Sequence, residues 1–393
     1  MRVTATKRAA CLLSVVALGA PSAAAAQPSP ASEPAAATAP APRESERESE
    51  RESEQDAELK PDLVATALSV VPGALLHGAG HYAAGERRTA YDLFLAEGIG
   101  LGMLLVGGGA LALTGAARDL VGPAAALSIA GAGLFGFSFL ADIYGIAVPG
   151  DWRGQPPTRA YATSRVGVAH VDDPQFDYGW FLTAGFEQWL GPLRVSPSAW
   201  FGLDSQNERL SLSLKPRFLG AVPGRAGADG SFLDADFGVT RHDFAADGFV
   251  NVTLETSLLG RLDLARIAPS LRGSFIEAGT GWGVTRTSYE VRGLDGAVID
   301  PDYAELLLFQ LAFGGYFRAG TGQWRAYYDH RHDDFAAGLL MPGIVSGVAG
   351  HFGLDIDYFF KSRLLGDQVG VGADAQVGAA YVLGLCVLYR EAM

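Results

Sequence analysis

The segment 329–334 is the densest group of reactive side chains and reads Asp-His-Arg-His-Asp-Asp. Residues two apart share a face of a β-strand, so His330 and His332 would point the same way. Two imidazoles in that arrangement can hold a metal ion, or one of them can act as a general base. We favour a solvated charge cluster at the rim or in an extracellular loop, because the segment follows the predicted strand that contains Trp324 to Tyr328.

The stretch from His330 to Asp334 is similar to the strand motif His-x-Ser-Asn-Ala of outer-membrane lipid A deacylases, in which histidine assists a nucleophilic serine. The resemblance implies an enzyme acting on envelope lipid, with His330 or His332 as the base. This chain departs from the motif because no serine stands at the expected place. We therefore expect a non-enzymatic protein and keep the lipid-directed enzyme as an alternative.

A second histidine pair, His77 and His81, lies in a glycine-rich segment. Residues four apart share a face of a helix. The sequence offers no third ligand beside them and no carboxylate before Glu86. We therefore expect no metal site here, and no cofactor anywhere in the chain.

Three segments alternate apolar and polar residues, namely 210–218, 250–262 and 369–381. A period of two is typical of strands with one apolar and one polar face. The pattern recurs from Tyr161 to Tyr389 in segments of about ten residues, a length that crosses a bilayer at a tilt. The predicted fold class is mainly β: an antiparallel transmembrane β-barrel of about 12 strands, preceded by a Gly/Ala-rich α-helical hairpin.

Charged residues of both signs occur on the polar face of these strands and would face the barrel lumen. They are Lys215, Arg217, Glu255, Arg261, Glu277, Arg286, Arg325, Asp355 and Asp357. Such residues can line a narrow channel, or they can pair with one another into a closed plug. The apolar face would contact lipid, with aromatic residues at the membrane interfaces; the alternative is an ordinary hydrophobic core.

Residues 61–150 interrupt the β pattern. Two uncharged segments rich in glycine and alanine, 98–117 and 120–141, flank a turn at Arg118 and Asp119 and predict a helical hairpin. The hairpin either packs against or within the barrel, or it anchors an inner-membrane protein with a periplasmic β domain. The linker 149–158 spans only ~35 Å, so the hairpin and the barrel cannot lie in two different membranes. We favour the first arrangement, because the predicted strands are long enough to cross a bilayer.

The N-terminal region carries targeting and linker signals. A basic start, an apolar run and Ala24-Ala25-Ala26 predict a secretory signal peptide over residues 1–26. Residues 27–60 contain a repeated Arg-Glu-Ser-Glu and predict a disordered linker. The barrel would then occupy residues 151–393. Loss of Cys11 with the signal leaves Cys386 without a disulfide partner.

Taken together, these features resemble bacterial outer-membrane β-barrel proteins in general, with no specific family matched. The resemblance implies a location in the cell outer membrane of a Gram-negative bacterium, with membrane lipid and other envelope proteins as partners. The expected function is a porin-like passive channel or a structural component of an envelope assembly. A net charge of −13 excludes nucleic acid as a partner. One departure is the C-terminal sequence Arg390-Glu391-Ala392-Met393, because many such barrels end in an aromatic residue.

Overall fold

The computed structural model describes residues 63–391, apart from 116–117, 158, 175, 177, 224–228, 245–247, 290–299, 332–334, 337–339, 342–343, 346–349 and 362–367. The predicted signal peptide, the predicted linker and His332 lie outside the described residues.

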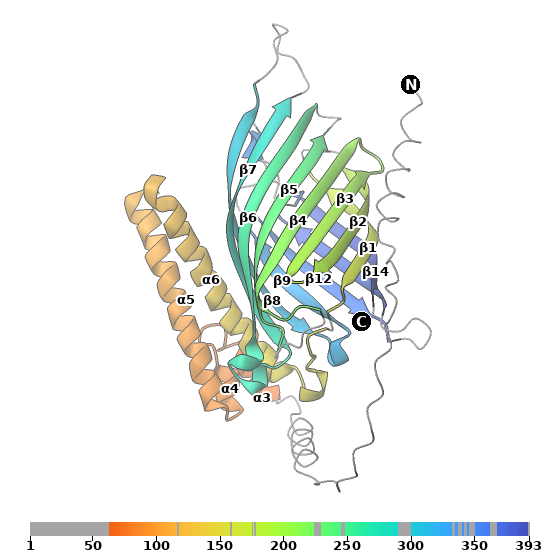
Figure 1. Cartoon of the computed structure of the whole chain (residues 1–393). Helices are drawn as coiled ribbons and strands as arrows, with labels where there is room; N and C mark the ends of the chain where they lie inside the picture. The colour runs from red at the N-terminus through yellow and green to blue at the C-terminus, as the bar shows by residue number, and fades with distance from the viewer. Residues whose placement is uncertain are drawn as a thin grey trace, which may run out of the picture. The chain divides into compact units, whose positions relative to one another are not determined.

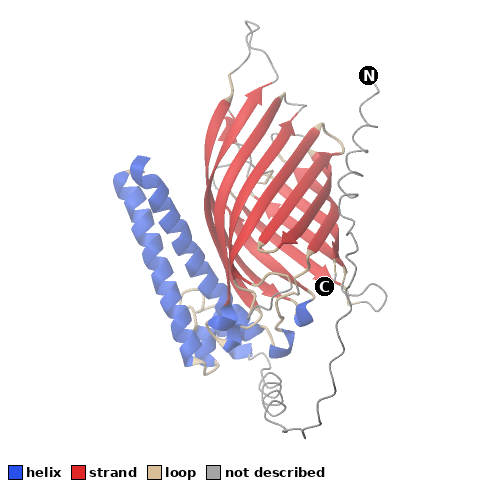
Figure 2. Cartoon of the chain, in the orientation of Figure 1, coloured by secondary structure: helices blue, strands red, loops and turns tan. Residues whose placement is uncertain are grey.

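Twelve antiparallel strands close into a barrel (Figures 1 and 2), which confirms the predicted fold class. They are β1 (Ala162–Asp172), β2 (Gly179–Leu190), β3 (Leu193–Gly202), β4 (Asn207–Gly220), β5 (Phe232–Phe244), β6 (Phe249–Asp263), β7 (Ser274–Tyr289), β8 (Asp302–Tyr316), β9 (Gly322–Asp329), β12 (His351–Phe359), β13 (Val369–Val377) and β14 (Tyr381–Arg390). A two-stranded hairpin, β10 (Leu340–Met341) and β11 (Ile344–Val345), lies in the connection between β9 and β12. The sheet closes because β1 pairs with β14 along its length, from Thr163 opposite Arg390 to Asp172 opposite Tyr381.

Side chains alternate between the two faces of the barrel wall, as the period of two requires. On β4, Leu210, Leu212 and Leu214 are 39%, 40% and 38% exposed. The residues between them, Ser211 and Ser213, line the interior. An exposed apolar face around a polar interior is the arrangement of a membrane barrel rather than of a soluble one.

Among the described residues, four α-helices precede the barrel: α3 (Leu63–Val70), α4 (Ala79–Ala83), α5 (Arg87–Thr114) and α6 (Arg118–Ala147). The long helices α5 and α6 form the predicted hairpin, and both are long and apolar enough to cross a membrane. The turn lies earlier than the sequence suggested, because α5 ends at Thr114, with Gly115 as its C-cap, and Arg118 already belongs to α6. Gly115 takes a left-handed conformation, with φ of 60°, and its N–H donates to the carbonyl oxygen of Leu111.

Glycines bring the two long helices into close contact. A Cβ atom placed at Gly100 would lie 2.6 Å from the backbone nitrogen of Phe135. One placed at Gly107 would lie 2.6 Å from the carbonyl oxygen of Ala124, and one at Gly131 would lie 2.6 Å from that of Gly100. Only residues without a side chain fit at these points, so the backbones pack directly, as in helix pairs within lipid.

Replacing Gly131 with leucine is expected to loosen the hairpin. Forcing a side chain into this contact costs about 1–3 kcal/mol. Backbone amides of α5 and α6 should then exchange with deuterium about tenfold faster or more, as measured by mass spectrometry. Gly136 in the same helix is the matched control, since a Cβ there meets nothing within 4 Å. Equal exchange in G131L and G136L would contradict the close contact.

The hairpin packs against the outside of the barrel rather than within it. Tyr144 of α6 belongs to a buried apolar cluster with Leu264 and Leu271 of the β6–β7 connection. Phe313, on the outward face of β8, joins the same cluster, and its ring centroid lies 6.1 Å from that of Tyr144. A Cβ at Gly133 would meet the side chain of Leu311, the next outward residue of β8. The base of α6 is therefore fixed to the barrel wall by apolar contacts.

Candidate functional site in the barrel lumen

The barrel encloses a cavity of about 740 Å³. Among the described residues, its lining includes nine basic side chains (Arg159, Arg165, Arg194, Lys215, Arg217, Arg261, Arg325, Arg331 and Arg390) and nine acidic ones (Glu187, Asp234, Asp236, Glu255, Glu277, Asp329, Asp355, Asp357 and Asp374). A lining with balanced charges of both signs suits water and polar solutes.

Eight of the nine charged residues predicted to face the lumen line this cavity: Lys215, Arg217, Glu255, Arg261, Glu277, Arg325, Asp355 and Asp357. They belong to β4, β6, β7, β9 and β12. Arg286, the ninth, lies instead on the outer face. It is exposed, whereas its neighbours Thr285 and Thr287 are buried. The physical reason is the strand period: Arg286 is an odd number of residues from Glu277 on β7, so the two point to opposite faces.

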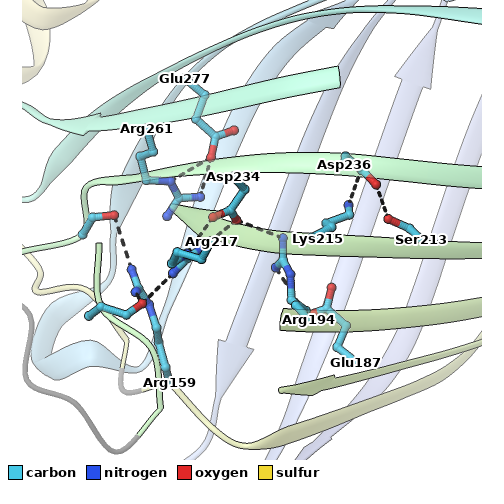
Figure 3. Close-up of polar contacts among 12 residues, drawn as sticks. Arg159, Glu187, Arg194, Ser213, Lys215, Arg217, Asp234, Asp236, Arg261 and Glu277 are labelled. Atoms are coloured by element: carbon cyan, nitrogen blue, oxygen red, sulfur yellow. Dashed lines mark hydrogen bonds and ion pairs between the residues drawn. The ribbon is translucent and has the colours of Figure 1, made fainter. Parts of the chain in front are cut away.

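Most of the lumen charges pair across neighbouring strands (Figure 3). Arg217 of β4 contacts Asp234 of β5 with two nitrogens, Nε to Oδ1 at 2.7 Å and Nη2 to Oδ2 at 2.8 Å. Lys215 lies 2.9 Å from Asp236, on the same strand as Asp234, and Asp236 also accepts a hydrogen bond from Ser213. These contacts stiffen the wall where β4 meets β5.

Glu277 is the centre of a second group of ion pairs. Its side chain is 1% exposed and receives Arg261 at 2.6 Å and Arg325 at 3.1 Å. Arg325 also lies 2.6 Å from Asp355. The chain of charges therefore links β6, β7, β9 and β12 around the wall. The lumen charges thus pair with one another while leaving a cavity between them.

Arginines alternate with aromatic rings around one end of the lumen. We call this set the arginine ladder; it comprises Arg194, Trp189, Arg217, Phe232, Arg261 and Phe275, from β2 to β7. The guanidinium of Arg217 lies 4.7 Å from the Trp189 ring and 4.4 Å from the Phe232 ring. Arg194 lies 5.4 Å from Trp189, and Arg261 lies 3.8 Å from Phe275. Cation–π contacts of this kind hold long side chains in place.

Register places the arginine ladder at the end of the barrel where β1 begins and β14 ends. Trp189 and Arg194 flank the β2–β3 turn, and Phe232 is the first residue of β5. The β2–β3 turn and the start of β5 lie at the same end of the sheet as Ala162, because successive strands are antiparallel.

The opposite end of the lumen is filled by an aromatic plug, which comprises Phe176, Tyr178, Phe181, Trp200, Phe244 and Phe335. Phe335, in the β9–β12 connection, is 3% exposed, and its ring centroid lies 4.9 Å from that of Phe181 and 5.3 Å from that of Trp200. The next residue, Ala336, accepts a hydrogen bond from the N–H of Ala380 in the β13–β14 turn, at 3.2 Å. Phe335 and Ala336 are therefore held at this mouth, the first by aromatic rings and the second by a hydrogen bond from the β13–β14 turn.

His330 lies away from the cavity, just beyond the end of β9. Its ring Nδ1 is 2.7 Å from the hydroxyl of Tyr328, and its ring also contacts Phe309. Tyr328 alternates with the lumen-lining residues Tyr327 and Asp329, so it is on the outward face. The structure therefore does not bring His330 together with the lumen charges.

The other histidine pair, His77 and His81, belongs to a buried polar network at the base of the hairpin. Asp142 is fully buried; its Oδ1 lies 2.6 Å from the ring Nδ1 of His81, and its Oδ2 accepts from the N–H of Gly78 at 3.0 Å. The ring Nδ1 of His77 lies 2.6 Å from the Ser138 hydroxyl, and the backbone N–H of His77 donates to the Glu97 carboxylate at 2.9 Å. Burial lowers the pKa of His77, against the opposing effect of Glu97 and Asp142.

This network fixes the glycine-rich turn to α5 and α6. Its carboxylates, Glu97 and Asp142, come from distant positions, so the local sequence around His77 gave no sign of them. In the part of the chain that the structure describes, no three His, Cys, Asp or Glu side chains are grouped to hold a metal ion.

No family model and no curated protein matches the chain. Among solved structures it is similar to the outer membrane protein Omp33 of Acinetobacter baumannii, with 11% identity over 60% of this chain and 99% of that one, at a TM-score of 0.30. It is similar to the KdgM porin, with 6% identity over 58% of this chain and 99% of that one, at a TM-score of 0.33. The NanC porin gives 8% identity over 58% of this chain and 100% of that one, also at 0.33. These neighbours accord with a general resemblance to outer-membrane barrels, and at such scores they assign neither a family nor a function.

Proposed function

We propose that the protein is an outer-membrane β-barrel that admits small polar solutes to its lumen. The observation that carries the proposal is the cavity of about 740 Å³ inside a closed barrel, lined by charged side chains of both signs. A barrel serving only as a scaffold has no need for a polar interior space, and apolar side chains would fill it more stably.

The outer face supports a location in lipid. On β14, Leu383, Leu385 and Val387 are 62%, 66% and 58% exposed, a level of apolar exposure that water disfavours. The hairpin presents a similar surface, with Phe94 and Leu105 of α5 exposed. At 28 residues, α5 is ~42 Å long, which exceeds the ~30 Å hydrocarbon core of a bilayer. Both parts would therefore contact acyl chains, with membrane lipid as the partner.

A closed structural barrel is the second candidate, and the aromatic plug is the observation that favours it. With Phe335 docked, one mouth is filled by rings. In that case the barrel would serve as a component of an envelope assembly. The position of His330 on the outward side, against Tyr328 and Phe309, adds no support for the lipid-directed enzyme.

The test combines fractionation with a permeation assay. Sucrose-gradient fractionation is expected to recover the full-length protein with the outer membrane, and recovery in the inner membrane would reject the proposed location. Liposomes carrying the purified protein are expected to swell in isotonic solutions of small sugars and amino acids. If liposomes with the wild type and liposomes with Phe335→Ala, which removes a ring of the aromatic plug, both swell no faster than empty ones, solute admission is rejected. The structural role then remains.

A further inference from the structure

Arg159 carries a charge that no carboxylate neutralises. It lies in the segment before β1 and lines the cavity. Its guanidinium donates to two carbonyl oxygens, of Ala221 and of Gly230, the second at 3.5 Å. Among the described residues it forms no ion pair. In the sequence, residues 224–228 between those two carbonyls include one charged residue, Arg225, and no acidic one.

Two further arginines share the surroundings of Arg159. Arg217 donates to the same carbonyl oxygen, of Ala221, at 2.7 Å. Arg194 lies 3.6 Å from Asp234, the carboxylate that Arg217 already engages with two nitrogens. Figure 3 shows Arg159, Arg217 and Arg194 gathered beside Asp234. Burial, followed by the charges of nearby Arg217 and Arg261, lowers the pKa of Arg159 to about 10, against the opposing effect of Tyr316 and Asp234, so Arg159 stays protonated at neutral pH.

The charges of this group do not balance. The carboxylates within reach of the three arginines are Asp234 and Glu187, and Glu187 lies 3.7 Å from Arg194, beyond hydrogen-bond distance. Three guanidinium groups therefore share two carboxylates, which leaves one unit of positive charge beside the cavity.

We propose that Arg159, Arg194 and Arg217 form a binding site in the lumen for the oxyanion group of a small solute, a carboxylate or a phosphate. The inference rests on the proposed function, because the ligand must be a solute that enters the lumen. Guanidinium groups bind such oxyanions through charge-assisted hydrogen bonds, which are stronger in a partly desolvated site. Trp189 and Phe232 flank Arg217 and hold it in position. Binding of a ligand would therefore cost little additional side-chain entropy at Arg217.

The test is equilibrium binding to the purified full-length barrel in detergent, by isothermal titration calorimetry at low ionic strength. Inorganic phosphate and acetate are titrated separately, which distinguishes the two sources of oxyanion. Saturable binding of either one, at one site per barrel, is expected. Arg159→Gln is expected to weaken it about tenfold, the effect of losing one charge-assisted contact.

Arg286→Gln is the matched control, since it removes the same charge from the outer face and should leave binding unchanged. Arg194→Gln is the second variant, for the case in which Arg159→Gln fails to fold. Its ion pairs are longer than 3.5 Å, so its loss should cost the barrel little stability. Heat-modifiable migration on a gel verifies that each variant is folded.

The result separates this inference from the proposed function. A barrel that lets liposomes swell but binds neither phosphate nor acetate overturns the oxyanion site and leaves solute admission intact. A barrel that binds one of them, with affinity lost in Arg159→Gln, supports the site even when liposomes fail to swell. Binding that is equally strong in Arg159→Gln, Arg194→Gln and Arg286→Gln also overturns it.

Discussion

Phe335→Ala is expected to open the mouth of the barrel and to raise the fraction of time that it conducts about a hundredfold. Phe335 is buried among Tyr178, Phe181 and Trp200, with ring centroids 4.9 to 5.3 Å away. Loss of a buried phenyl ring costs about 3–5 kcal/mol. A loss of about 3 kcal/mol from the docked state of the β9–β12 connection shifts its equilibrium by about two powers of ten. Single-channel recording in planar bilayers gives the open fraction directly.

Phe352→Ala is the matched control for this experiment. Phe352 is 64% exposed on the outward face of β12, so the same substitution there removes a ring without touching the aromatic plug. Its open fraction should equal that of the wild type. Indistinguishable recordings from F335A, F352A and the wild type would mean that the plug does not control the mouth.

Glu277→Ala is expected to lower the free energy of unfolding of the barrel by about 3–5 kcal/mol, because two cations in the wall lose their shared partner. Glu277 receives Arg261 at 2.6 Å and Arg325 at 3.1 Å. Arg325 keeps the carboxylate of Asp355, whereas Arg261 keeps a neutral hydrogen bond to Gln323 and its contact with the Phe275 ring, so Arg261 bears most of the loss. Denaturant unfolding in lipid vesicles, followed by tryptophan fluorescence, measures the change.

The double variant Glu277→Ala/Arg261→Ala distinguishes an ion-pair effect from a packing effect. Removing both partners should cost less than removing Glu277 alone, since no unpaired cation is left behind. Glu305→Ala is the surface control, because Glu305 on β8 is exposed, and its substitution should change stability by less than about 0.5 kcal/mol. A fully additive cycle would contradict the pairing.

The strands and their faces could be predicted because they depend on a local period. On β6, Val250, Val252 and Leu254 alternate with the inward residues Asn251 and Thr253, as in the sequence pattern. Counting by two is enough to orient every residue once one is placed. The one error, Arg286, came from grouping it by charge rather than by its distance from Glu277.

The aromatic plug could not be predicted, because it depends on contacts between distant segments. Phe335 lies in an irregular connection with no periodic pattern, and its partners come from β2, β3 and β5. The same holds for Asp142, which lies 61 residues from His81. The pairing of the lumen charges likewise depends on the register between neighbouring strands. Alternation within one strand gives the face of each residue but not its partner on the next strand.

The closure of the barrel has a consequence for how the chain folds. Pairing Thr163 with Arg390 joins the first strand to the last, so it is the most non-local contact of the sheet. Contacts of such large sequence separation form slowly, since the chain entropy is lost before the contact is gained. Until β14 arrives, two sheet edges carry unpaired N–H and C=O groups, each of which costs several kcal/mol in hydrocarbon. Insertion into the bilayer and closure of the sheet must therefore proceed together. The free edge of β1 must also be kept from pairing with other strands until β14 has formed.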